Sequence, residues 1–147
     1  MAERKATAEW KGDLKQGVGK MSLGSGAFEG KFSFNTRMGD EPGTNPEELI
    51  AAALAGCYSM ALNATLEKAG TPATSVNSQA IVHFGKDDKG FAIQSIDLET
   101  KAAVQGISEE EFLQTAENVK ETCPVSKALG AVPIRLNASL ANAQAGS

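Results

Sequence analysis

The sequence has few of the residues that build metal sites, nucleic-acid surfaces and disulfide-stapled folds. It contains only two cysteines and one histidine among 147 residues, and these side chains cannot supply four zinc ligands without help from carboxylates. Lysine and arginine are scattered without a run, and the formal net charge is −4. Because phosphate binding needs a basic face, we expect neither a structural metal nor a nucleic-acid partner.

No secretion signal or membrane span is expected either. The charged residues at 3–5 are not followed by an apolar segment of the kind found in signal peptides. The long apolar run at residues 49–62 follows two carboxylates and is shorter than a membrane span. These features predict a soluble cytoplasmic protein. In a reducing compartment, two cysteines are more often free, transient or catalytic than joined in a permanent disulfide.

The length and composition predict one domain over residues 1–147, with 41% hydrophobic and 22% charged residues. Strands are predicted at residues 5–11, 17–23, 28–34, 75–82, 91–100 and 133–140, and the fourth and fifth should form a hairpin turned at residues 86–90. Residues 37–45 are predicted to be a loop, and the small, polar tail at residues 141–147 should be frayed.

A long central helix is predicted to begin at Asn45. Asn45 is a good N-cap, Pro46 suits the first helical position, and Glu48 can complete a capping-box-like pair. The helix should stop just before Gly70, which gives about 24 residues, or roughly 36 Å. Residues 49–62 are apolar nearly all round, so we expect this helix to be buried on several sides.

Two shorter helices should follow the hairpin. Ser108 opens a second capping box and a helix to about Thr122, and Cys123 before Pro124 fits the cap of a short helix over residues 124–129. The resulting order, β-β-β-α-β-β-α-α-β, predicts an α+β fold with mainly antiparallel sheets around the long helix.

The two cysteines lie in unlike settings. Cys57 lies within the apolar run, where a cysteine can behave as a small hydrophobic residue. However, Gly56 costs the helix roughly 1 kcal/mol relative to alanine and clears space beside Cys57. At Cys123, the helix dipole and free N–H groups would favour the thiolate, the only form of a thiol that does chemistry. The two residues could therefore act as an attacking and a resolving pair.

An arginine and two glutamates could assist. Arg37 could hold Cys57 as a thiolate, with Glu47 or Glu48 fixing the guanidinium by a bidentate contact. Helix capping also explains both glutamates without catalysis. Ten residues on one helix separate Glu47 from Cys57 by roughly 15 Å and place them on different faces. Either an arginine bridges part of this gap or the two residues come from different subunits.

A cysteine hydrolase is a rival reading of Cys57. It would use His83, at the end of a predicted strand, as the base. A histidine on a strand is more often an ordinary polar residue, and no oxyanion-hole motif stands out.

Four segments, in order along nearly the whole chain, resemble the OsmC branch of the OsmC/Ohr family. The family comprises osmotically inducible protein C and the organic hydroperoxide resistance proteins. The segments are residues 34–37, 43–53, 55–62 and 123–126, and the block from Thr44 to Cys57 is highly specific. The Ohr branch carries its arginine nearer the N-terminus, where this chain has only Arg4 in the wrong context.

The resemblance implies roles for four residues. Cys57 matches the peroxidatic cysteine, Cys123 the resolving cysteine, Arg37 the OsmC-branch arginine, and Glu47 the glutamate that orients the arginine. It also implies an intertwined homodimer with an OsmC-like fold and two sites at the interface.

The implied activity is that of a thiol-dependent peroxidase without cofactor or metal. Cys57 would reduce organic hydroperoxides, and hydrogen peroxide more weakly, to give an alcohol and a sulfenic acid. Cys123 would then form a Cys57–Cys123 disulfide, which an external dithiol reduces. The alternative is a non-catalytic thiol sensor or small-molecule binding protein of the same fold.

Overall fold

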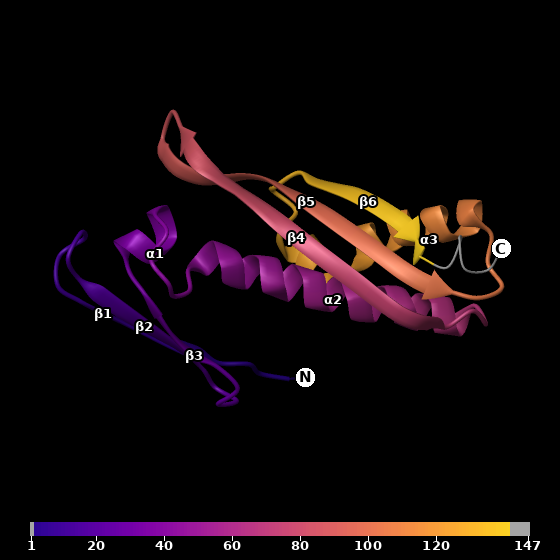
Figure 1. The fold of residues 1–147 in the computed structure, drawn as a ribbon, viewed down its shortest axis with the longest axis horizontal. Helices are drawn as coiled ribbons and strands as arrows, with labels where there is room; N and C mark the ends of the chain where they lie inside the picture. The colour runs from indigo at the N-terminus through magenta and orange to yellow at the C-terminus, as the bar shows by residue number, and fades with distance from the viewer. Residues whose placement is uncertain (1, 142–147) are drawn as a thin grey trace. The chain divides into compact units, whose positions relative to one another are not determined.

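The elements follow one another as three strands, two helices, a long hairpin, two more helices and a last strand (Figure 1). The structure is a computed structural model that describes residues 2–141. The chain divides into two compact units, Met1–Leu49 and Ile50–Ser147, and each is described by itself. Residues 142–147, which make up most of the predicted frayed tail, lie outside the described residues.

The first unit is built on a three-stranded antiparallel sheet of β1 (Ala6–Lys11), β2 (Val18–Leu23) and β3 (Glu29–Phe32), in that order. Trp10 and Phe32, from the two outer strands, both pair with Gly19 of the central strand, and their rings lie 5.5 Å apart. A Cβ atom at Gly19 would collide with the Phe32 ring. The absence of a side chain at Gly19 therefore lets the two rings meet across the sheet.

A short helix, α1 (Phe34–Met38), follows β3 and corrects two predictions. The strand predicted to reach Phe34 ends at Phe32, and the loop predicted from residue 37 begins later. Ser33 Oγ accepts a hydrogen bond from Thr36 N at 3.1 Å, while Ser33 N donates to Thr36 Oγ1 at 2.8 Å. This reciprocal capping box uses threonine in place of the usual glutamate or glutamine, and it places Arg37 on a helix.

The long helix α2 (Pro46–Lys68) begins and ends where the sequence predicts. Asn45 Oδ1 accepts from Glu48 N at 2.8 Å, which satisfies one of the free N–H groups of the first turn. The Glu48 carboxylate accepts instead from Thr44 Oγ1 at 3.0 Å. Gly70, with φ of 89°, follows the helix in the left-handed conformation typical of helix ends.

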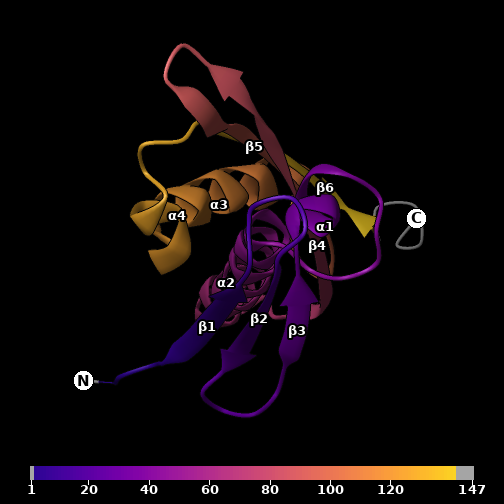
Figure 2. The same ribbon diagram turned by 90° about the vertical axis from the view of Figure 1, so that its left-hand side faces the viewer.

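The second unit has a mixed sheet in the order β4 (Ala73–Asp87), β5 (Gly90–Val104), β6 (Ile134–Leu140). The β4–β5 hairpin is antiparallel and several residues longer than predicted, whereas β6 runs parallel to β5. The crossover between β5 and β6 contains α3 (Glu109–Thr122) and α4 (Pro124–Ala128). Helices α2 and α3 pack against one face of this sheet (Figures 1 and 2).

The core of the second unit lies between this sheet face and the two long helices. Its helical residues recur every three or four positions, and its strand residues on β5 recur every second position. The main members are Leu54, Tyr58, Leu62 and Leu66 of α2, Ile96, Leu98, Ala102 and Val104 of β5, and Phe112, Ala116 and Val119 of α3.

A single chain does not bury helix α2 on several sides, because Ala52, Ala53 and Gly56 are exposed and Met60 is 79% exposed. Helix α2 nevertheless contains an 18-residue stretch that is long and apolar enough to cross a membrane by length and composition. The apolar run at residues 49–62 was expected to be too short for a membrane span, and this reasoning does not extend to the longer helix. The core helix of a soluble protein can have the same length and composition.

Candidate functional site

The two cysteine thiols meet inside the second unit. Cys57 lies midway along α2 and is half-buried, while Cys123 joins α3 to α4 and is 1% exposed. Both are free, and their Sγ atoms are 3.0 Å apart. With both thiols protonated, Cys123 donates to Cys57. Two residues 66 positions apart in the sequence are therefore close enough to share a proton.

The contact between α2 and α3 holds the thiols together. Tyr58, the neighbour of Cys57, is fully buried, and its hydroxyl donates to Ala116 O of α3 at 2.8 Å. At the end of α3, Cys123 N donates to Val119 O, and Cys123 O accepts from Lys127 N, each at 2.9 Å. The cysteine backbone is thus bonded into both helices that it joins.

The two thiols differ in acidity. Burial raises the pKa of the Cys57 thiol, and the hydrogen bond with Cys123 raises it further. Burial alone would also raise the pKa of Cys123. Hydrogen bonds to the Cys123 thiolate, from Cys57, from the Ser126 and Val125 backbone and from the Ser126 hydroxyl, outweigh that effect and lower the Cys123 pKa. The first proton lost therefore leaves the charge on Cys123, and Cys57 then becomes the donor.

An arginine–glutamate pair lies in the first unit. Arg37 Nε donates to Glu47 Oε1 at 3.0 Å and Arg37 Nη2 to Glu47 Oε2 at 2.7 Å. The Glu47 side chain is 11% exposed and that of Arg37 is 39% exposed. The hydrogen bond that Arg37 donates to Glu47 raises the pKa of Arg37, which stays charged. The sequence left both Glu47 and Glu48 as possible partners of Arg37, and Glu47 is the one that makes the bidentate contact.

The loop between α1 and α2 sets the position of this ion pair. Thr36 Oγ1 donates to Thr44 O at 2.8 Å, and Asn45 Nδ2 donates to Thr36 O at 3.2 Å. Thr44 N in turn donates to Lys31 O of β3 at 2.9 Å. These bonds join the first turn of α2 to α1, which brings Glu47 opposite Arg37.

The structure separates His83 from Cys57. His83 is exposed on β4, while its neighbour Val82 packs, like Cys57, against the buried core. His83 Nε2 lies 2.8 Å from Asp97 Oδ2, and Arg135 Nε donates to Asp97 Oδ1 at 2.8 Å. The histidine belongs to a charged cluster on the outer face of the sheet and is not in place to act as a base for Cys57.

Ser126 is a residue to which the sequence analysis gives no role. It is buried at the third position of α4, three residues after Cys123, and its hydroxyl is among the groups that lower the Cys123 pKa. The spacing is the signal that could have identified it, because the N-cap side chain of a capping box reaches the third helical residue.

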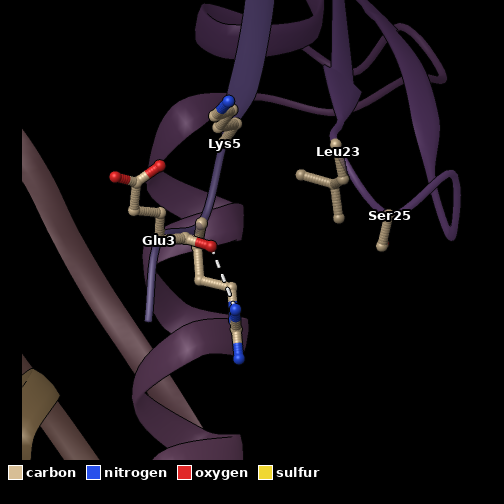
Figure 3. Close-up of a pocket in the computed structure, with 6 residues that line it drawn as sticks. Glu3, Lys5, Leu23 and Ser25 are labelled. Carbon is tan, nitrogen blue, oxygen red and sulfur yellow. Dashed lines mark hydrogen bonds between the residues drawn. The ribbon is translucent and has the colours of Figure 1, made fainter. Parts of the chain in front are cut away.

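Neither of two cavities in the described part of the chain is lined by any of the four predicted site residues. One of about 520 Å³ is lined by Glu3, Arg4 and Lys5 before β1 and by Leu23, Gly24 and Ser25 at the end of β2 (Figure 3). A second, of about 220 Å³, is lined by Ser126 and by residues of α3 and β6. Among residues 2–141, no group of three or more His, Cys, Asp and Glu side chains could hold a metal ion.

Comparison of the sequence with known proteins gives a family match and two curated relatives. Residues 39–137 match the family model described as OsmC-like protein. The chain is 46% identical over 129 residues to Peroxiredoxin OsmC of Escherichia coli strain K12, which covers 87% of this chain and 90% of the relative. Peroxiredoxin OsmC of Shigella flexneri matches with the same identity and coverage.

Solved structures with the same fold include two organic hydroperoxide resistance proteins. The protein from Elizabethkingia anophelis has a TM-score of 0.75 at 24% identity, covering 95% of this chain and 96% of the other. OhrB of Bacillus subtilis has a TM-score of 0.72 at 25% identity, covering 91% and 97%. The predicted α+β, OsmC-like fold is confirmed by these likenesses.

Proposed function

The chain belongs to the family of OsmC-like proteins and is a cysteine-based peroxidase, and we propose that it reduces organic hydroperoxides to alcohols through Cys57 and Cys123. Hydrogen peroxide would be a poorer substrate. The observation that carries this proposal is the pair of free thiols with Sγ atoms 3.0 Å apart, one half-buried and the other buried.

Cys57 is the attacking residue in this proposal, because it is the more accessible thiol. A peroxide that enters from solvent meets Cys57 before the 1% exposed Cys123. Since the sulfurs are 3.0 Å apart, Cys57 can pass its proton to the Cys123 thiolate and attack as the thiolate. The Cys57 sulfur bonds to the distal peroxide oxygen and the O–O bond breaks. The released alkoxide takes up the proton from Cys123 and leaves as the alcohol, which restores the Cys123 thiolate.

Cys123 is the resolving residue. Its thiolate attacks the Cys57 sulfenic acid, an S–S bond forms, and hydroxide leaves and is protonated to water. An external dithiol then attacks the disulfide, and its second thiol releases the protein from the mixed disulfide. The close approach of the two sulfurs in the reduced chain supports this step, because only a small movement is needed to form the bond.

Arg37 and Glu47 act in the same site in this proposal. Arg37 would stabilise the Cys57 thiolate and the charge that develops on the leaving oxygen, and it would offset the burial that raises the Cys57 pKa. Glu47 is a positioning residue, because two hydrogen bonds fix the plane of the guanidinium. Exposed apolar side chains such as Phe28, Met38 and Met60 would suit the organic part of the substrate.

The proposal includes one domain per chain and a homodimer that shares its sites. One helix carries both Glu47 and Cys57, and ten residues of helix span roughly 15 Å. A second chain that supplies Arg37 and Glu47 would close each site. We also place the protein in the cytoplasm as a soluble enzyme, where small dithiols keep the thiols reduced.

Peroxide consumption with a dithiol reductant tests this function. The wild type should turn over a panel of organic hydroperoxides faster than hydrogen peroxide, and Cys57→Ser should abolish turnover while the protein stays folded by circular dichroism. His83→Gln is the matched control and should consume peroxide like the wild type. Turnover retained in Cys57→Ser would contradict the mechanism. A single reaction per chain in the wild type would indicate a thiol sensor, and a large loss in His83→Gln would favour a hydrolase.

A further inference from the structure

Ser126 has a buried hydroxyl without a hydrogen-bond partner among residues 2–141. The residue is 6% exposed. Among the buried side-chain oxygen and nitrogen atoms of residues 2–141, its Oγ is the one that makes no hydrogen bond. Burying an unpaired hydroxyl is unfavourable. Such a group in a native fold therefore requires an explanation, and a change of state at a functional group nearby is one.

The group that changes state is Cys123. It caps α4, and Ser126 is the third residue of that helix, which is the residue whose backbone N–H a cap side chain reaches in a capping box. The neutral thiol makes no side-chain cap hydrogen bond, and its proton is directed to Cys57 at 3.0 Å. A thiol sulfur is a weak acceptor, whereas a thiolate accepts hydrogen bonds well.

We propose that Ser126 is a positioning residue for the resolving thiol, whose hydroxyl donates a hydrogen bond to Cys123 only when Cys123 is a thiolate. The inference rests on the peroxidase cycle proposed above. In the reduced, fully protonated chain the hydroxyl stays unpaired, and loss of the Cys123 proton gives it its partner. The electrostatics agree, because the Ser126 hydroxyl is one of the groups that lower the Cys123 pKa.

Two steps of the cycle would use this hydrogen bond. In resolution, the Cys123 thiolate gives its electron pair to the Cys57 sulfur while the S–O bond breaks and hydroxide leaves. In reduction, an external thiolate attacks Cys57, the S–S bond breaks, and the electron pair returns to Cys123 as the leaving thiolate. A thiolate of lower pKa leaves faster, so the Ser126 hydroxyl would speed reduction as well as supply the thiolate for resolution.

Titration of Cys123 in the Cys57→Ser background tests the inference. That background leaves one thiol, and its ionisation can be followed by the ultraviolet absorbance of the thiolate. Burial raises the pKa of Tyr58, the single tyrosine, far above the thiol range, so the two signals do not overlap. Adding Ser126→Ala should raise the Cys123 pKa by about one unit, the usual effect of losing one hydrogen bond to a charged group.

Matched variants separate the hydroxyl from the shape of the side chain. Ser126→Thr keeps the hydroxyl and should titrate like serine, while Ser126→Val has the same shape without it and should titrate like Ser126→Ala. Ser139→Ala, on the outer face of β6, should leave the pKa unchanged. Equal Cys123 pKa values in the serine, alanine and valine forms would overturn the inference. If Ser126→Ala misfolds, the threonine and valine pair decides.

A kinetic readout with both cysteines present connects the hydrogen bond to the cycle. A pKa higher by one unit leaves up to tenfold less thiolate, but the remaining thiolate is roughly threefold more nucleophilic, so Ser126→Ala should form the disulfide roughly threefold more slowly near neutral pH. Quenched mass spectrometry after one equivalent of organic hydroperoxide measures this rate. An unchanged rate beside a shifted titration would contradict the role in resolution.

The two proposals fail in different ways. The titration uses no peroxide, so it can overturn the role of Ser126 even where the wild type is an active peroxidase. Conversely, a wild type that leaves organic hydroperoxides intact would refute the proposed function, while the titration would still report the hydrogen bond.

Discussion

At the scale of single residues, accessibility and acidity favour different members of the thiol pair. Cys57 is the thiol that a substrate can reach, but Cys123 is the one with the lowered pKa. With Sγ atoms 3.0 Å apart, a proton can pass directly between them, so the charge can move to Cys57 when a cation or a peroxide favours it. An acidic resolving thiol is also ready to attack as soon as the sulfenic acid forms.

Replacing Cys123 should separate attack from resolution. Cys123→Ser keeps the accessible Cys57, so we expect one equivalent of organic hydroperoxide per chain to be reduced, after which the protein stalls as a sulfenic acid or over-oxidises. Intact-mass spectrometry after one equivalent of oxidant checks this, and a Cys57–Cys123 disulfide should form in the wild type only. Two free thiols in the oxidised wild type would contradict the assignment.

The adjacent glutamates Glu47 and Glu48 offer a matched pair of variants. Glu47→Gln removes the charge that holds Arg37 in its bidentate contact, and we expect kcat/KM for an organic hydroperoxide to fall roughly ten- to hundredfold because the guanidinium is misplaced. Glu48→Gln is the control, since its carboxylate bonds to Thr44, and it should stay close to the wild type. Equal losses in both variants would point to helix capping in place of arginine positioning.

At the scale of elements, local signals were predictable from the sequence and pairing between distant segments was not. Asn45 and Gly70 mark the ends of α2 because caps and left-handed glycines act within one turn. Helix α1 was missed because its capping box uses Thr36. The parallel pairing of β6 with β5 leaves no mark in the alternation of β6, since alternation specifies the buried face and not the partner strand.

In the candidate site too, single residues could be identified from the sequence, but the contacts between distant residues could not. The sequence identified both cysteines as chemically unusual and left Glu47 and Glu48 as equal candidates for contact with Arg37. The 3.0 Å approach of Cys57 to Cys123 depends on how α2 packs on α3, which spacing along the chain does not specify. The contact of Arg37 with Glu47 likewise depends on the loop bonds made by Thr36 and Asn45.

The contact between α2 and α3 can be tested through Tyr58. Tyr58→Phe removes the hydrogen bond to Ala116 O and keeps the buried ring, so we expect the free energy of unfolding to fall by about 1 kcal/mol. Urea unfolding of the reduced protein, with the same protein concentration for every variant, measures this change. Thr65→Val, which removes an exposed hydroxyl bond within α2, is the control and should have a smaller effect. No change in Tyr58→Phe would show that the hydroxyl adds nothing to the packing of the two helices.

At the scale of the whole molecule, one chain leaves much of α2 uncovered. Met60 is 79% exposed, and Ala52, Ala53 and Gly56 are exposed beside it. A Cβ atom at Gly56 would meet nothing within 4 Å, so the space next to Cys57 is open in the single chain. A second copy would bury this apolar face, which is why we propose a dimer in preference to a monomer.

A shared site makes a prediction that neither the fold nor the thiol chemistry makes alone. If Arg37 and Glu47 of one chain serve Cys57 and Cys123 of the other, a Cys57→Ser chain paired with an Arg37→Ala chain has one complete site and one doubly defective site. Random subunit exchange puts half of the chains in such heterodimers, so mixing the two inactive parents should restore roughly a quarter of wild-type turnover. Cys57→Ser mixed with Cys123→Ser is the control and should restore no turnover. Both thiols of a site come from the second unit of the same chain, so each chain in this mixture lacks one of the two thiols that its site needs. A monomer in sedimentation would refute the assembly itself. A dimer without recovery would show instead that each chain completes its own site.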